Sequence, residues 1–376
     1  MSDKRYLILA EEYSHDPHYG KTMWGVMRYR RESVVAILDS KRAGETELGV
    51  PIVATVNDAL CFNPNTALVG VVTQGGHFPG DWQALLKSAA AKGLDIENGL
   101  HYRLREVPGL VETAQKHGVE LIDLREPPAG VSTATGANLS VPATIVLTVG
   151  TDCAIGKMTA TCELDLEARG RGLKSVFVPT GQTGIAIAGW GIAVDAVVSD
   201  FIAGAAERLV VEGHERGGEL LWVEGQGSIL HPVYSGVTLG LIHGSAPHLY
   251  VLCHEVGRDE VEGAGGGPHP LPPLAEWVEL HERMSLRARP AKVAAIAMNT
   301  RFVDEEAARA AIEEAERETG LPADDPVRFG AAKLVDAVLA LGQDYASPHP
   351  NCPDGASASR LNCRSDRGKA AKGDNL

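Results

Sequence analysis

The stretch from Ala143 to Thr159, ATIVLTVGTDCAIGKMT, constrains this chain more than any other. A short apolar run leads into a loop bounded by Gly150 and Gly156, and Lys157 then opens an expected helix. Backbone N–H groups in such a loop converge on an anion, and the helix N-terminus adds the positive end of its dipole. The pattern predicts a phosphate-binding loop with Lys157 on the phosphate oxygens; the alternative is a glycine-rich turn without a ligand.

The loop departs from the usual P-loop pattern in two ways. Five residues separate the two glycines instead of four, and Met158 stands where a hydroxyl residue is expected after the lysine, with Thr159 one place later. The longer loop resembles that of dethiobiotin synthetase, which reads G-T-D-T-x-V-G-K-T. The residues expected to contact the ligand are Gly150, Thr151, Asp152, Cys153, Ala154, Ile155, Gly156, Lys157, Met158 and Thr159.

Length and charge limit the class of protein. A chain of 376 residues suggests two domains, and its net charge of −14 argues against a nucleic-acid partner, because phosphate backbones need a basic face. No run approaches a membrane span, and the N-terminus does not read as a signal peptide. The six cysteines are scattered without metal-site spacing, which fits reduced thiols in a cytoplasmic protein. A homo-oligomer is the expected assembly.

The first part of the chain alternates strands with helices. Strands are expected at 5–10, at 33–38 and from residue 66, and helices at 21–30, 80–93 and near 107–117. This spacing predicts a Rossmann-like parallel sheet over residues 1–126, although the dinucleotide fingerprint G-x-G-x-x-G is absent. Residues 127–142 are rich in Pro, Gly, Ser and Thr and are predicted to be a linker.

The second part predicts a P-loop NTPase-like domain of three α/β/α layers over residues 143–343, followed by a disordered tail at 344–376. A helix at 157–169 is expected to turn Met158, Cys162, Leu164 and Leu166 inward. A glycine-dense binding loop is expected at 180–200, where Gln182, Thr183 and Gly184 offer backbone N–H donors. An apolar strand ends at Glu224, where P-loop domains usually place a metal-side carboxylate. Further strands are expected to end at Glu255 and Asn299.

Several long stretches resemble one two-domain family, long described as of unknown function, that includes D-glutamate N-acetyltransferases of bacterial D-amino-acid catabolism. They are KTMWGVMRYR, GLDIENGLH, VGTDCAIGKMTA, PTGQTGIAIAGWGIAVDAVVSDFIAGAAE, VEGQGSILHPVYSGVTLGLIHGS and VLCHEVGR. The resemblance implies transfer of acetyl from acetyl-CoA to the amine of an acidic D-amino acid. In addition, GVPIVATVNDA is similar to a stretch of the CoA-binding domain of succinyl-CoA synthetases, although a purely structural α/β layer would explain it equally well.

Acetyl transfer to an amine needs a base, and His231 is the first candidate, with Glu224 as base if no metal binds. Arg258 and Lys157 are candidates for holding carboxylate or phosphate groups. A second hypothesis is a ligase or kinase that uses ATP and Mg²⁺, with Thr159 and Glu224 at the metal. A third is a nucleotide or CoA sensor without turnover.

Overall fold

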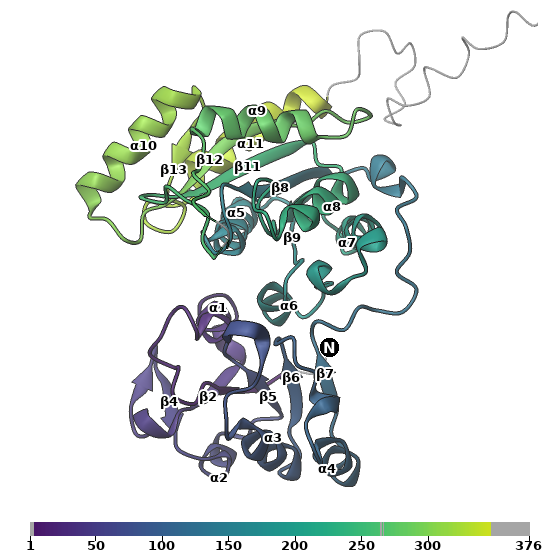
Figure 1. The fold of residues 1–376 in the computed structure, drawn as a ribbon, viewed down its shortest axis with the longest axis vertical. Helices are drawn as coiled ribbons and strands as arrows, with labels where there is room; N and C mark the ends of the chain where they lie inside the picture. Colours follow the sequence, from purple (N-terminus) through teal and green to yellow (C-terminus); the bar gives the residue numbers. More distant parts are fainter. Residues whose placement is uncertain (1–3, 264, 266, 347–376) are drawn as a thin grey trace, which may run out of the picture.

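The computed structural model describes residues 4–263, 265 and 267–346, which form two α/β domains stacked one above the other (Figure 1). The predicted disordered tail lies outside the described residues, apart from the end of the last helix, which reaches Ala346. Among the described helices, none combines the length and the apolar character needed to cross a bilayer.

The N-terminal domain is a sheet in the order β3-β4-β2-β1-β5-β6-β7, parallel except for the β3–β4 pair. The central strand β1 is fully buried, because helix α1 covers one face of the sheet and α2, α3 and α4 cover the other. The predicted Rossmann-like architecture is therefore confirmed. Its elements are β1 (Tyr6–Leu9), α1 (Lys21–Tyr29), β2 (Val34–Leu38), β3 (Thr46–Glu47), β4 (Val50–Val53), α2 (Val56–Ala59), β5 (Thr66–Val69), α3 (Trp82–Ala91), β6 (Asp95–Asn98), α4 (Leu110–His117) and β7 (Leu121–Asp123).

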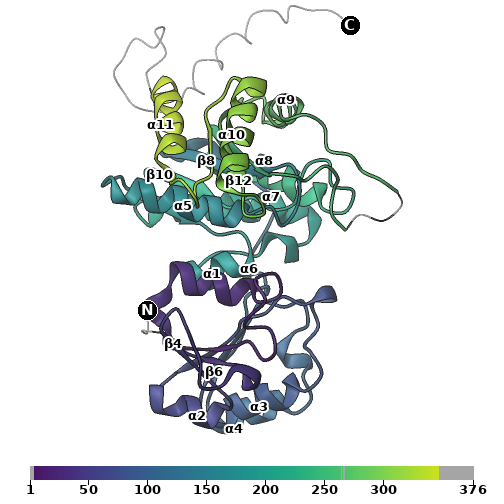
Figure 2. The same cartoon turned by 90° about the vertical axis from the view of Figure 1, so that its left-hand side faces the viewer.

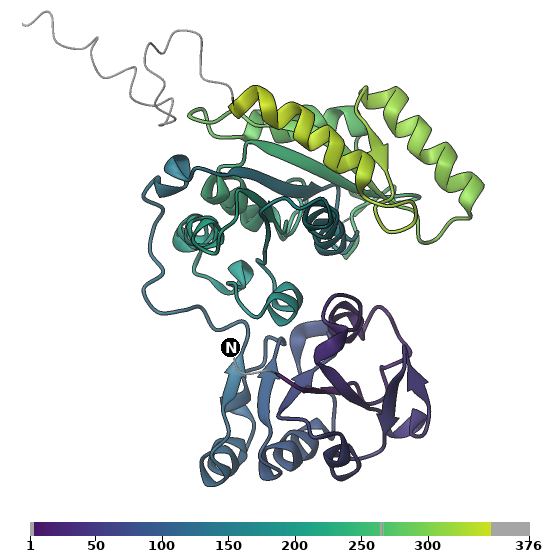
Figure 3. The ribbon, with the colours of Figure 1, turned by 180° about the vertical axis from the view of Figure 1, so that it is seen from behind.

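The C-terminal domain is a parallel sheet in the order β13-β12-β11-β8-β10-β9. Helices α5 and α11 pack on one face, and α7, α8, α9 and α10 pack on the other, which gives the three predicted layers. Figure 3 shows α11, in yellow, lying across its face of the sheet. The elements are β8 (Thr144–Gly150), α5 (Lys157–Gly170), β9 (Ser175–Val178), α6 (Gln182–Ala188), α7 (Ile202–Glu215), β10 (Leu220–Val223), α8 (Ser235–Ser245), β11 (Leu249–Glu255), α9 (Leu274–Met284), β12 (Lys292–Asn299), α10 (Glu305–Thr319), β13 (Ala323–Asp324) and α11 (Ala332–Ala346).

Four points in the predictions about this domain need correction. The expected glycine-dense loop contains helix α6, and the helix α8 was not predicted at all, because glycines in both segments hide the helical pattern. On α5, Cys162 and Leu164 are buried as predicted, but Leu166 is 45% exposed because two residues turn the helix by about 200°. Met158 points to the other domain instead of the sheet.

The two domains meet where α1 packs beside α6, as Figure 2 shows. The hydroxyls of Thr22 and Thr183, each the second residue of its helix, lie 3.0 Å apart and are buried. Near the other ends, Arg30 donates to the carbonyl of Ala186 at 2.9 Å. The two helices therefore run side by side with their N-termini together. Ala186 belongs to the same apolar cluster as the α1 residues, so the core of the N-terminal domain extends across the boundary.

Gly25 permits this close approach of the helices, and replacing it gives a test. A Cβ at position 25 would lie 2.8 Å from the Thr183 methyl carbon, so Gly25→Val should destabilise the protein by roughly 1–3 kcal/mol through overpacking. Gly236 of α8 has open space where its Cβ would be, so Gly236→Ala should be neutral or stabilising by up to about 1 kcal/mol. Urea unfolding measures both; equal stabilities would contradict the packing described.

Candidate functional site

The phosphate-binding loop has the geometry that its sequence predicts. Strand β8 ends at Gly150, and Gly156 takes a left-handed conformation with φ 103° directly before α5 begins at Lys157. The Lys157 side chain is only 6% exposed, and its Nζ donates to the carbonyl of Asp152 at 2.6 Å. Burial lowers the pKa of Lys157. In the described part of the chain no carboxylate pairs with it, so this ammonium is available for an anion in the loop.

Asp152 connects the loop to the rest of the domain through hydrogen bonds and an ion pair. Its buried carboxylate accepts from the backbone N–H of Cys153 at 2.7 Å and of Glu262 at 2.8 Å. Arg258 also contacts it at 3.2 Å, and pairs with Glu255 and Glu262 at 2.6 Å each. Arg258 thus lies beside the loop but is engaged by three carboxylates, which makes it a support of the loop; a role in ligand binding stays a prediction.

The two residues after Lys157 face different surroundings. The Met158 methyl lies 3.5 Å from where a Cβ of Gly25 would be, so it packs against α1 in the place where a P-loop usually offers a metal-binding hydroxyl. Thr159 instead lines a cavity of about 410 Å³. Glu224, the other predicted metal ligand, lies against α6. The roles of Thr159 and Glu224 as metal ligands stay a prediction.

This cavity adjoins the phosphate-binding loop. Its lining combines apolar residues with two arginines, Arg301 and Arg328. Asp325, also in the lining, accepts from the backbone N–H groups of Thr300 and Arg328. The lining residues are Ile155, Gly156, Thr159, Ala160, Cys253, Ala297, Met298, Asn299, Arg301, Asp325, Pro326, Val327 and Arg328.

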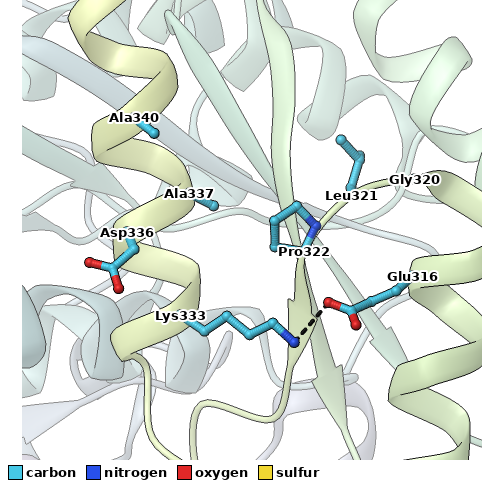
Figure 4. Close-up of a pocket in the computed structure, with 8 residues that line it drawn as sticks. All are labelled: Glu316, Gly320, Leu321, Pro322, Lys333, Asp336, Ala337 and Ala340. Carbon is cyan, nitrogen blue, oxygen red and sulfur yellow. Dashed lines mark ion pairs between the residues drawn. The ribbon is translucent and has the colours of Figure 1, made fainter.

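A larger and more open hollow of about 740 Å³ lies between α10, α11 and β13, at the edge of the sheet (Figure 4). Lys333 and Glu316 form an ion pair across it at 2.7 Å. Since β8 is three strands away from β13 in the sheet, this hollow lies apart from the phosphate-binding loop. None of the predicted site residues lines this hollow, and we do not assign it to the functional site.

Glu224 follows β10 and is held under the first turn of α6. It is 3% exposed, and its Oε2 accepts from the N–H groups of Thr180 at 2.9 Å and Gly181 at 3.1 Å. A Cβ on Gly184 would lie 2.4 Å from the same oxygen, so a larger residue there would displace the carboxylate from its position. Burial raises the pKa of Glu224 to about 7, against the lowering by these two N–H groups and by the charge of Lys21. A carboxyl group with such a pKa exchanges protons near neutrality.

The predicted residues Gln182 and Thr183 face the N-terminal domain from α6. Thr183 bonds to Thr22, and the Gln182 side chain lies 2.8 Å from where a Cβ of Gly99 would be. Their roles as ligand-contacting residues stay predictions, but the structure places them with Gly184 and Glu224 at one location. We call this location the domain junction: the first turns of α1 and α6 together with Glu224 and Cys153.

Lys21 is the residue at the domain junction that sequence reasoning missed. It opens α1, remains accessible to solvent, and within the described chain its ammonium has no hydrogen bond or ion pair. Crowding by both domains lowers its pKa, and Glu224 is the charged group that acts on it most strongly. The sequence did hold a signal for Lys21, because it belongs to KTMWGVMRYR, one of the stretches that carry the family resemblance. That stretch was interpreted only as an amphipathic helix, and Lys21 was not considered as a site residue.

His231 lies beside the loop, although its ring is engaged by the protein. The side chain is buried, Nδ1 accepts from the N–H of Val233 at 3.1 Å, and Nε2 lies 3.3 Å from the carbonyl of Glu262. Ligand-type atoms of Asp152, Cys153 and His231 all lie within 4.8 Å of one another, a grouping that suits a metal ion. The cations Lys157, Lys21 and Arg258 act on Cys153, however, and would repel one.

The fold and this site define a two-domain α/β protein with a phosphate-binding loop at the junction of its domains. Family models match residues 39–127, as the Rossmann-like N-terminal domain of unknown function DUF1611_N, and residues 132–335, as the P-loop domain of DUF1611. The chain belongs to this family.

Named relatives and a solved structure agree with this membership. A protein of Tritonibacter scottomollicae named D-glutamate N-acetyltransferase is 37% identical over 342 residues, 91% of this chain and all of that protein. One of the same name from Pseudoalteromonas sp is 34% identical over 75% of this chain and 83% of its own length. The crystal structure of a DUF1611 family protein from Anabaena variabilis has a TM-score of 0.81 and 41% identity, covering 90% of this chain and 99% of that one.

Removal of the Lys157 ammonium tests the phosphate-binding loop. Lys157→Ala should weaken binding of CoA, or of ATP if that is the ligand, by roughly tenfold or more, because a charge-assisted contact to phosphate is lost. Isothermal titration measures the affinity. Lys174→Ala, at a surface lysine paired only with Glu219, is the control and should bind like the wild type. Unchanged affinity in the Lys157 variant would exclude the loop as the phosphate site.

Proposed function

We propose that this protein transfers acetyl from acetyl-CoA to the amine of D-glutamate, giving N-acetyl-D-glutamate and CoA. The structural observation that carries the proposal is the Glu224 carboxyl group. Its pKa is about 7, and it lies between the phosphate-binding loop and the N-terminal domain, under the start of α6. The names of the two relatives support the same reaction and the acidic acceptor. A role in D-amino-acid catabolism in the cytoplasm is part of this proposal.

Acetyl-CoA suits the phosphate site of this chain. An N–H nest and a buried lysine bind the diphosphate of CoA as they would bind that of a nucleotide. The cavity beside Gly156 and Thr159 is the proposed place of the adenosine end, with Arg301 and Arg328 near its phosphate. Acetyl transfer includes no phosphoryl step, so the hydroxyl that Met158 replaces is not needed.

Glu224 is the base that this geometry favours. In its ionised form it takes a proton from the acceptor ammonium, and the free amine attacks the thioester carbonyl carbon to form a tetrahedral oxyanion. As the carbonyl re-forms, the C–S bond breaks, and the protonated Glu224 gives its proton to the leaving thiolate. The attacking nitrogen loses its second proton to solvent, so that one proton is released for each amide formed. His231 stays a second candidate, but both of its ring nitrogens already face protein partners.

The competing function is an ATP- and Mg²⁺-dependent ligase or kinase, favoured by the P-loop itself and by Thr159 one place after the usual hydroxyl. The products separate the hypotheses. Purified protein given acetyl-CoA and D-glutamate should release free CoA thiol and N-acetylglutamate, measured by thiol titration and mass spectrometry. Formation of ADP and phosphate from ATP without acetylated amine would establish the competing function, and binding without either product would indicate a sensor.

The pH profile and a variant of Glu224 test its role. Since Glu224 must be ionised to accept the proton, kcat/KM should rise with pH through about 7 and then level off. Glu224→Gln should lower kcat by roughly 10²–10⁴-fold and keep CoA affinity. Glu219→Gln, at an exposed residue just before the same strand, is the matched control. Wild-type turnover in Glu224→Gln would rule out this base, and a large loss in His231→Ala would support the other.

A further inference from the structure

The N-terminal domain brings one uncompensated cation to the site. Lys21 lies next to Thr22, whose hydroxyl contacts Thr183 of α6. The next residue of α6, Gly184, lies against the Glu224 carboxylate. Lys21 and Glu224 therefore approach the domain junction from different domains.

Other charges around Lys21 do not neutralise it. Apart from Glu224, the charged or titratable groups that act on its ammonium include Arg125, Cys153, Arg301 and Lys157. Arg125 already pairs with Asp195 of the other domain, and Arg301 pairs with Glu255 at 2.7 Å. Burial raises the pKa of the Cys153 thiol, which keeps it neutral. The three N–H donors of Lys21 thus face a solvent-accessible position without an anion of the protein bound to them.

We propose that Lys21 binds a carboxylate of the acceptor amino acid and thereby turns the acceptor ammonium towards Glu224. This inference rests on the proposed function and makes it more specific, since it places the acceptor between the domains. An ammonium that is exposed enough to be reached but crowded by protein binds a carboxylate more strongly than a fully hydrated one does. An acidic amino acid carries a carboxylate for Lys21 and an ammonium for Glu224, so its two charges match the pair.

The arrangement also explains why the two domains share one apolar cluster. Lys21 belongs to α1 and Glu224 to the P-loop domain, so the distance between the carboxylate-binding and proton-accepting groups depends on how α1 docks on α6. A docked interface fixes that distance before the substrate arrives, which is the condition for orienting an amine towards its base.

Three variants test this inference. Lys21→Met removes the charge and should raise KM for D-glutamate at least about tenfold while leaving CoA affinity and thermal stability unchanged. Lys21→Arg retains a cation and should restore much of the affinity. Lys92→Met, at an exposed lysine after α3, should behave like the wild type. Equal KM values in a folded Lys21→Met protein would overturn the inference.

The pH profile provides a readout that a structural role would not change. The Lys21 charge lowers the pKa of Glu224, and the other groups near this carboxyl are Gln226 and the neutral thiol of Cys162. In Lys21→Met the rising limb of kcat/KM should therefore move to higher pH, whereas in Lys92→Met it should stay in place. If the rising limb of kcat/KM stays at the same pH in Lys21→Met as in the wild type, Lys21 does not face Glu224.

A binding measurement separates failure of this inference from failure of the proposed function. Glutarate, a dicarboxylate without an amine, should bind to the wild type and to Lys92→Met in isothermal titration, and much more weakly to Lys21→Met. If no acetyl transfer occurs but this pattern holds, the carboxylate subsite stands and the reaction is wrong. If acetyl transfer occurs and glutarate binds equally to all three proteins, the subsite is wrong and the reaction stands.

Discussion

Helix α6 is fixed between two contacts that leave no room for a side chain, and the candidate site depends on them. On one side Gly184 lies against the Glu224 carboxylate, and on the other Gly25 of α1 lies against Thr183. Because Gly184 has no side chain, α6 lies close enough to Glu224 to cover its carboxylate. Because Gly25 has none, α1 packs closely against Thr183, so α6 contacts both domains. The same short helix therefore buries Glu224, which raises its pKa, and places Lys21 near it.

Several cations gather near the loop of this acidic protein. The chain has a net charge of −14, yet Lys21, Lys157 and Arg258 all act on Cys153 in the loop. CoA and an acidic amino acid are both anions, and a protein of this net charge repels them at long range. Binding then requires cations held close together and partly desolvated, where each contact is stronger than at the surface. Arg258 is neutralised by three carboxylates, which leaves the two lysines for ligands.

Local patterns were enough to predict the phosphate-binding loop, the position of Glu224 at a strand end and the two α/β domains, because each depends on a few neighbouring residues. Helix α6 was predicted to be a loop, because Gly184 reads as a flexible residue when its contact with Glu224 is unknown. The packing partner of the Met158 side chain is α1, which lies more than a hundred residues earlier in the sequence. For Lys21 the family resemblance of KTMWGVMRYR was the signal in the sequence, but its interaction with Glu224, on another domain, could not be read from neighbouring residues.

A phosphate-binding loop without its usual hydroxyl suits a reaction in which the phosphates serve only to hold the substrate. Contacts to parts of a substrate that do not react can be used to orient the part that does. Here the sequence position of the usual hydroxyl is occupied by Met158, whose methyl group lies close to α1 of the N-terminal domain. Met158, in place of the usual hydroxyl residue, thus weakens the case for phosphoryl chemistry. The same residue also contributes to the domain junction, where the acceptor is proposed to bind.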